Sequence, residues 1–507
     1  MDQSLTKDRN ELASPTSASA SAAAALSWLT FEVALYGVIA IAALAVRLAA
    51  LDRWPLLETG ANTALAAWRT IHGSAWRPAH YVPLLYSAQL PLFWATRATD
   101  AAATLLPALA GAGLALLPLF ARDLLGRKGA LAASLLLAFA PTWVFFSRTA
   151  DSPILTAAAS ALLLLAVHRY LQSRRARDAQ LGAVALALGL TAGPGIYTTL
   201  LIGLLYGAFR WARSSEEERD DLCAAFEGVR TRQNLFWLLG VFALVASAFT
   251  ANPQGIGASV EQLGYWWRYL SPSQSDLPWY AFPRTLALYE FLTLALAIVG
   301  AATTLRRREP VAIFATAWFA LALILGLLGH RQPMWLPDAL LPLVVLAAYG
   351  VEYLWNRLAP EAILLDGVIT FAVLAIIGFT FVELATFIQT GQEQQFTYAR
   401  IAWGVLLIGW AAYSLWGYRD SASRVATAAI LVVMTIFTVR ATTAVAYQTA
   451  RDPREPLVYQ PSSAQLRDFE ALVADTSSRQ AGDPHILDIA YEEPFTPWVA
   501  WALRDYP

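Results

Sequence analysis

The sequence predicts an all-α protein that crosses a membrane many times. Of its 507 residues, 57% are apolar and 14% are charged, whereas a soluble domain averages about 45–50% apolar and about 25% charged residues. Apolar runs recur along the chain, and each is long enough to cross about 30 Å of hydrocarbon as a helix. The net charge of −1 argues against a nucleic-acid partner. The bilayer itself is therefore the first expected partner.

About thirteen membrane spans are expected between residues 28 and 446. We place them at 28–50, 100–121, 129–147, 152–171, 179–194, 196–212, 234–250, 284–305, 310–328, 337–355, 362–388, 401–417 and 424–446. The two spans beside residues 191–195 could instead be one broken helix, because Gly and Pro stand there. The Ser/Ala-rich residues 1–27 are expected to be a disordered cytoplasmic tail.

The basic residues predict which loops face the cytoplasm. They gather in alternate loops, at Arg122, Arg127, Lys128, Arg169, Arg174, Arg175, Arg177, Arg210, Arg213, Arg306, Arg307 and Arg308. The other set of loops then faces outward, at 52–86, 147–151, 251–283, 330–338 and 391–400. We expect a multi-pass protein of the plasma membrane, with its N-terminus in the cytoplasm and its C-terminus outside.

Residues 52–99 are expected to form a large first outward loop with interfacial helices. This polar run includes Glu58, His80 and Tyr81. In a chain built for hydrocarbon, such a run lies in water, at the interface or in a protein-lined cavity. Glu58 follows two leucines, so its pKa could be raised and suited to proton transfer. An ordinary solvated carboxylate is the other interpretation.

A second polar cluster, Ser-Arg-Thr-Ala-Asp, occupies residues 147–151. Arg148 could hold a phosphate, and Asp151 could accept a proton as a general base. Alternatively, Asp151 caps a helix that starts at Ser152-Pro153. Such a cap needs no arginine, which favours a functional role for Arg148.

Aromatic residues gather in the outward loops, above all at Tyr265-Trp266-Trp267. They suit either a membrane interface or the face of a sugar, and spacing does not separate the two. No Cys/His spacing indicates a zinc site. A divalent metal stays open, because Glu58 and Asp151 could ligate one if they converge.

Residues 447–507 form an outward segment that is more polar than the rest. An amphipathic helix is expected at 463–475 and a strand at 485–490, which would make a short α/β tail. The segment is too short to build much of a core alone. It either packs on the membrane part or is an incomplete soluble domain.

Several stretches, in order along the chain, resemble one family of membrane enzymes. They are Arg53-Trp-Pro-Leu with Ala61 and Ala64, His80 to Tyr86, Leu105 to Gly111, Ser147 to Ala150, Leu277 to Tyr280, Leu288 to Glu290, Gly329 to Pro333 with Trp335, and Trp498 to Tyr506. The chain resembles the GT-C superfamily of glycosyltransferases and its protein-mannosyltransferase-like clan. Within that clan it is most similar to the flippase-activity-associated proteins linked to archaeal-type N-glycosylation.

The resemblance implies a GT-C-like bundle and a defined reaction. Such enzymes take a sugar from a polyprenyl-phosphate carrier and pass it to a glycan, lipid or protein acceptor on the outer face. The family carries an Asp-Glu pair in the first outward loop. Here Thr59 and Gly60 stand at that place, and Glu58 lies one residue early.

The resemblance also completes the list of candidate residues. Glu58 and Asp151 are the expected catalytic acids. The expected substrate-binding residues are Arg148, His80, Tyr81, Arg331 and Trp335. Because the Asp-Glu pair is absent, a degenerate relative that binds lipid-linked glycan, or assists its flipping or assembly without turnover, is the alternative function.

Overall fold

The computed structural model describes residues 31–73, 81–271, 276–357, 363–416, 418–460, 463–492 and 497–507. Within these ranges every regular element is a helix, which confirms the all-α class. The expected disordered tail at residues 1–27 lies outside the described residues. The strand expected at 485–490 is wrong: the Ser477 hydroxyl accepts the backbone N–H groups of Ile486 and Leu487 at 3.2 and 3.4 Å. No neighbouring strand is present in the described chain to pair with this segment.

The helices follow one another without any sheet in the described ranges. They are α2 (Phe31–Leu48), α3 (Glu58–Ile71), α4 (Pro83–Ala95), α5 (Asp100–Leu116), η1 (Leu117–Ala121), α6 (Arg122–Leu125), α7 (Arg127–Phe139), α8 (Pro141–Ser147), α9 (Ser152–Ser173), α10 (Ala176–Ala192), α11 (Ile196–Arg213), α12 (Glu216–Val229), α13 (Arg232–Ala246), α14 (Gly255–Arg268), α15 (Ala281–Tyr289), α16 (Phe291–Thr304), α17 (Pro310–Leu328), η3 (Pro333–Trp335), α18 (Leu336–Arg357), α19 (Ile363–Thr390), α20 (Glu393–Leu415), α21 (Arg419–Thr443), η5 (Ala444–Gln448), α22 (Leu466–Ala481) and α23 (Trp498–Ala502).

The described chain contains seven helical segments long and apolar enough to cross a membrane. Two bent pairs raise this number to nine if each pair is one span: α7 with α8, bent by 54°, and α15 with α16, bent by 94°. The multi-pass class follows from these segments. The count of thirteen stays a prediction, because helices such as α13 are apolar but shorter than a full span.

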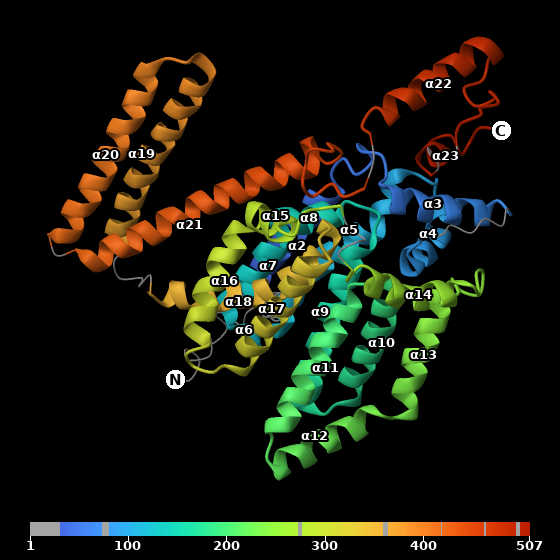
Figure 1. The fold of residues 1–507 in the computed structure, drawn as a ribbon, viewed down its shortest axis with the longest axis horizontal. Helices are drawn as coiled ribbons and strands as arrows, with labels where there is room; N and C mark the ends of the chain where they lie inside the picture. Colours follow the sequence, from blue (N-terminus) through green and yellow to red (C-terminus); the bar gives the residue numbers. More distant parts are fainter. Residues whose placement is uncertain are drawn as a thin grey trace, which may run out of the picture.

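The helices form two neighbouring groups with a cover at one end (Figure 1). One group is built around α2, α5, α7, α16, α17 and α18, and the other around α9, α10, α11 and α13, with α12 across its lower end. Helices α3, α4 and α14 lie over the opposite, upper end, and α22 and α23 continue beyond α3. The α19–α20 hairpin stands apart and is joined to the body by α21. Residues 193–195 separate α10 from α11, at the position where Gly and Pro stand in the sequence.

Helices α16 and α18 cross with their backbones in close contact. A Cβ atom added to Gly300 would lie 1.8 Å from the Leu346 carbonyl oxygen, and one added to Gly350 would lie 2.1 Å from that of Leu296. Small residues let helix backbones approach in this way inside a membrane. The backbone atoms on the facing helix cannot rotate away, so the crossing depends on glycine at both positions.

We predict that Gly300→Ala and Gly350→Ala each lower the melting temperature of the detergent-purified protein. Gly203→Ala in α11 is the matched control, because nothing lies within 4 Å of its Cβ position. Helix propensity alone should make that control neutral or up to about 1 kcal/mol more stable. Equal behaviour of all three variants in a thermal unfolding assay would show that the α16–α18 crossing is looser than described.

Candidate functional site

The turn between α8 and α9 is anchored by Arg148. Its two Nη atoms donate four hydrogen bonds of 2.7–3.2 Å to carbonyl groups at the end of α2, those of Val46, Arg47, Ala49 and Ala50. The Tyr447 ring covers the guanidinium at 4.4 Å. A helix end leaves four carbonyl groups without partners, so Arg148 caps α2. The Nη donors of this predicted phosphate ligand are therefore already engaged by the protein.

Asp151 lies in the same turn and is buried, with 2% of its surface exposed. One carboxylate oxygen accepts the Ser152 backbone N–H at 2.6 Å, so Asp151 does cap α9. The other oxygen accepts a hydrogen bond from the Tyr459 hydroxyl and a longer one, 3.4 Å, from the Gln460 amide. Burial raises the pKa of Asp151, and these hydrogen bonds only partly offset the rise.

Gln460 connects Asp151 to the start of α3. Its amide nitrogen donates to the Thr59 hydroxyl at 2.6 Å, and its amide oxygen accepts the Thr59 backbone N–H at 3.1 Å. Gly60 packs directly on the turn, since a Cβ atom there would meet the Ala150 carbonyl oxygen at 2.9 Å. We call Thr59, Asp151, Tyr459 and Gln460 the Asp151 network. It joins three segments that are distant in sequence.

Glu58 is the first residue of α3 and sits directly beside this network. Its side chain is half-buried and makes no hydrogen bond or ion pair with any residue that the structure describes. A carboxylate in the first turn of a helix is favoured by the helix dipole. Thr59 and Gly60, at the place of the expected acid pair, serve as contacts for Gln460 and Ala150.

Four rings form a wall that leads from the loop after α17 to the Asp151 network. Ring centroids are 4.4 Å apart for Tyr265 and Tyr269, 6.4 Å for Tyr269 and Trp335, and 3.9 Å for the stacked Trp335 and His330. Burial is the main cause that raises the pKa of Tyr265, and the Asp151 charge adds to it. The aromatic wall, Tyr265, Tyr269, His330 and Trp335, therefore ends close to Asp151.

The charge of His330 and the burial of the adjacent tryptophans describe the surroundings of this wall. Burial lowers the pKa of His330 to about 4, so the imidazole is neutral at pH 7. Trp266 is buried and donates to the Thr198 hydroxyl at 3.0 Å. Trp267 is 69% exposed, as an interfacial tryptophan would be.

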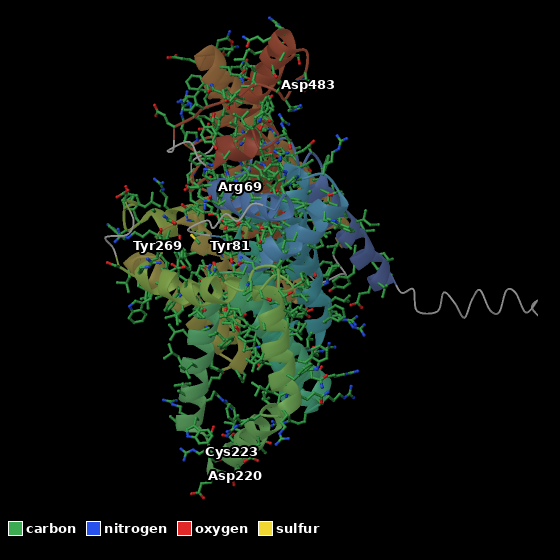
Figure 2. All side chains as sticks on the ribbon, turned by 90° about the vertical axis from the view of Figure 1, so that its right-hand side faces the viewer. Arg69, Tyr81, Asp220, Cys223, Tyr269 and Asp483 are labelled. Carbon is green, nitrogen blue, oxygen red and sulfur yellow. The ribbon has the colours of Figure 1, made fainter. Side chains whose placement is uncertain are left out.

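The remaining predicted ligands lie in different surroundings. The Tyr81 hydroxyl accepts a hydrogen bond from Asn252 at 3.0 Å, and burial raises the pKa of Tyr81 to about 12. Arg331 is half-buried and donates to the carbonyl oxygens of Leu277 and Leu328 at 3.0 and 3.2 Å. His80 lies outside the described residues. Figure 2 shows Tyr81 and Tyr269 at one level, between Asp483 above and Asp220 below.

The tail after α21 supplies the site residues that sequence reasoning missed. Tyr459 and Gln460 reach Asp151, and the buried Arg451 donates to the Pro55 carbonyl oxygen at 2.7 Å. Burial lowers the pKa of Arg451 to about 10. The one available signal was the polarity of residues 447–460 next to an apolar span.

The tail contacts the start of α5. Asp100, at the start of α5, accepts hydrogen bonds from Arg467 and from the Trp501 indole N–H, the latter at 2.5 Å. In the described part of the chain no group of three or more His, Cys, Asp or Glu side chains is placed to hold a metal ion. A divalent metal at Glu58 and Asp151 stays a proposal.

The fold is shared with solved membrane-protein structures. ArnT from Cupriavidus metallidurans bound to undecaprenyl phosphate has a TM-score of 0.57 and 16% identity, over 95% of this chain and 85% of that chain. The apo oligosaccharyltransferase of Archaeoglobus fulgidus has a TM-score of 0.52 and 15% identity, over 95% and 61%. AglB of the same organism, in complex with an inhibitory peptide and a dolichol-phosphate, has a TM-score of 0.50 and 14% identity, over 94% and 60%.

At these identities the likeness establishes the GT-C-like fold alone. No protein-family model matches the sequence, and no curated protein does. The chemistry of this chain must therefore be argued from its own residues.

We predict that the stability advantage of the wild-type protein over Asp151→Asn falls as the pH rises from 4 to 8. The folded-state pKa of Asp151 is raised, so its stabilising contribution is complete while it is protonated and is lost as the pH rises through that pKa. Asparagine has no such titration. Melting temperatures of both proteins across this range test the sign, with the exposed Asp276→Asn as the baseline. If the melting-temperature difference between the wild type and Asp151→Asn stays constant or grows with pH, the pKa of Asp151 is not raised in the folded protein.

Proposed function

We propose that this protein is a membrane glycosyltransferase that moves a sugar from a polyprenyl-phosphate carrier to an acceptor at the outer face of the plasma membrane. The observation that carries the proposal is the Asp151 network, which brings a buried carboxylate, the start of α3 and the tail together at the upper end of a GT-C-like bundle. Two neighbours with this fold have bound undecaprenyl phosphate and a dolichol-phosphate, respectively. The motifs quoted above further favour the flippase-activity-associated branch.

The acid that touches the acceptor is Glu58 in this proposal. A general base must come within about 2.6–3.2 Å of the proton it removes, directly or through one water. Glu58 is half-buried and has no partner among the described residues, whereas both oxygens of the buried Asp151 already accept hydrogen bonds. Asp151 is then a positioning residue, because it holds Thr59 through Gln460 and so fixes the first turn of α3.

The reaction would be a single displacement at the sugar. The acceptor hydroxyl gives its proton to the Glu58 carboxylate while its oxygen forms a bond to the anomeric carbon. The bond from that carbon to the phosphate oxygen breaks, and the carrier leaves as polyprenyl phosphate. Negative charge develops on the leaving phosphate, so the reaction depends more on stabilising that charge than on a covalent intermediate with the protein. Arg331, half-buried next to His330 of the aromatic wall, is the proposed contact for it.

The aromatic wall would support the sugar, and the basic residues at the opposite end would indicate which side of the membrane the site faces. The half-buried Tyr265 and Tyr269 would offer ring faces near Asp151, and flat apolar surfaces of this kind suit a sugar ring. Trp335 is buried and packs against Tyr269, so it would support that ring. The lower end carries α12 and the basic residues Arg174, Arg210 and Arg213. By the positive-inside rule that end would face the cytoplasm, and the site would face outward.

We predict that Glu58→Gln lowers the release of polyprenyl phosphate from an undecaprenyl-phosphate-linked sugar by about 10²–10⁴-fold, the usual worth of a general base. Asp151→Asn should lower the rate less and should shift its pH profile. Glu261→Gln, an exposed acid on α14, is the control and should keep the wild-type rate. Unchanged rates in both Glu58→Gln and Asp151→Asn would remove these residues from the mechanism.

A catalytically degenerate relative that binds lipid-linked glycan, or assists its flipping or assembly, is the second candidate function. It is favoured by Thr59 and Gly60 at the place of the acid pair and by the engagement of the Arg148 Nη atoms with carbonyl groups. Native mass spectrometry with undecaprenyl phosphate separates the two functions. Carrier binding without release of sugar to any tested acceptor would support the degenerate relative.

A further inference from the structure

Three arginines are buried at the upper end of the bundle without a carboxylate partner. Arg47, Arg148 and Arg451 are 0%, 8% and 6% exposed. Within the described ranges none of them makes an ion pair at 4.0 Å or less. Buried charges in proteins are normally paired, because an isolated ion loses its hydration. Asp100 attracts Arg451 from beyond ion-pair distance, so the positive charge of this cluster has no carboxylate in direct contact among the described residues.

Two buried acids at this end of the bundle already have other partners. Asp100 holds the Arg467 guanidinium and the Trp501 indole. Asp151 holds Tyr459 and the Ser152 backbone. Since burial also raises the pKa of Asp151 and favours its neutral form, that residue balances little of the charge.

Arg148 and Arg451 line the same small cavity, together with Trp54. The cavity has a volume of about 10 Å³, roughly the space that one water-sized particle occupies. A single atom therefore fits this small space better than a tetrahedral oxyanion such as phosphate, which has five heavy atoms.

The groups without partners around this cavity are hydrogen-bond donors. The Arg148 Nε and Trp54 Nε1 atoms are buried and have no hydrogen-bond partner in the part of the chain that the structure describes. Arg451 uses Nε and Nη1 on the carbonyl oxygens of Pro55 and Ala450, which leaves Nη2 without an acceptor among the described residues. The nearby Thr149 hydroxyl donates to the Phe146 carbonyl oxygen.

We infer that this cavity binds one halide ion, chloride under cellular conditions, between Arg148, Arg451 and Trp54. An anion accepts from all three donors and balances the buried charge. A lone water would leave both guanidinium charges uncompensated. The bound ion would join the loop after α2 to the α8–α9 turn and the tail, and the last two of these segments also meet in the Asp151 network. The site is independent of the proposed glycosyl transfer.

Thermal unfolding at constant ionic strength tests the site directly. The wild-type protein, in nanodiscs of zwitterionic lipid, is titrated with sodium chloride against sodium gluconate. Because a ligand of the folded state stabilises it by mass action, we expect the melting temperature to rise with chloride, saturably, by about 2 °C or more. Bromide should substitute for chloride, and crystals grown in bromide should show an anomalous peak beside Arg451 Nη2.

Two variants and one control locate the ion. Arg451→Gln should abolish the chloride response and the bromide peak. Trp54→Phe keeps the ring but loses the donor, so about tenfold more chloride should be needed for half of the shift. Arg97→Gln removes the same charge from an exposed position and should respond like the wild type.

Three outcomes would overturn the inference. Equal melting temperatures in chloride and gluconate with no bromide peak would mean that water alone fills the cavity. A stronger response to inorganic phosphate than to chloride would assign the cavity to an oxyanion. A chloride response that Trp54→Phe leaves unchanged would place the ion elsewhere, and this variant answers the question even if Arg451→Gln fails to fold.

Discussion

The capping of α2 by Arg148 is the interaction on which the upper end of the molecule depends. The end of a helix leaves carbonyl groups without partners inside the helix, and each one that is buried unpaired is costly. Arg148 donates to the carbonyl groups of Val46 and Arg47 in α2 and of the two alanines that follow it, and places its own backbone in the turn before α9. That turn carries Asp151 and packs against Gly60, so the position of α3 follows from the same contact. The tail is fixed there as well, through Tyr447 against the guanidinium.

The class of the fold was predictable because the bilayer imposes it. Hydrocarbon thickness sets the length of an apolar helix, and backbone hydrogen bonding in lipid excludes open strands. The expected strand at 485–490 failed for a related reason. The apolar sequence of this segment gave no information about a partner strand, and two of its backbone N–H groups instead bond to the Ser477 hydroxyl in α22. The count of spans is harder to predict, because bent pairs such as α15 with α16 divide one apolar run into two helices.

The candidate site was predictable only in part. Asp151 stood out locally, and the structure gives it a helix cap together with long-range contacts. Tyr459 and Gln460 are more than 300 residues away from Asp151 in the sequence, so no local spacing could reveal them. For Arg148, the sequence analysis weighed a phosphate contact against a cap of the following helix. The guanidinium instead reaches back to the preceding α2, a contact that depends on tertiary packing.

The fold of this chain is shared with solved structures, whereas its proposed chemistry depends on its own residues. Neighbours at 14–16% identity share the helical frame, yet Thr59 and Gly60 replace the acids that the resembled family carries. In their place the chain has Glu58, one residue earlier. Glu58 precedes Thr59, which belongs to the Asp151 network. The proposed function therefore depends on whether the lipid carrier approaches this end of the bundle at all.

Photocrosslinking would decide that question most directly. A polyprenyl phosphate with a photoreactive group next to its headgroup, reconstituted with the protein in nanodiscs, labels whatever lies beside the phosphate. Labels on Glu58, Tyr269 and Arg331, mapped by mass spectrometry and displaced by unmodified carrier, are the expected result. Labels confined to α12 or to the α19–α20 hairpin would contradict a carrier site at the Asp151 network.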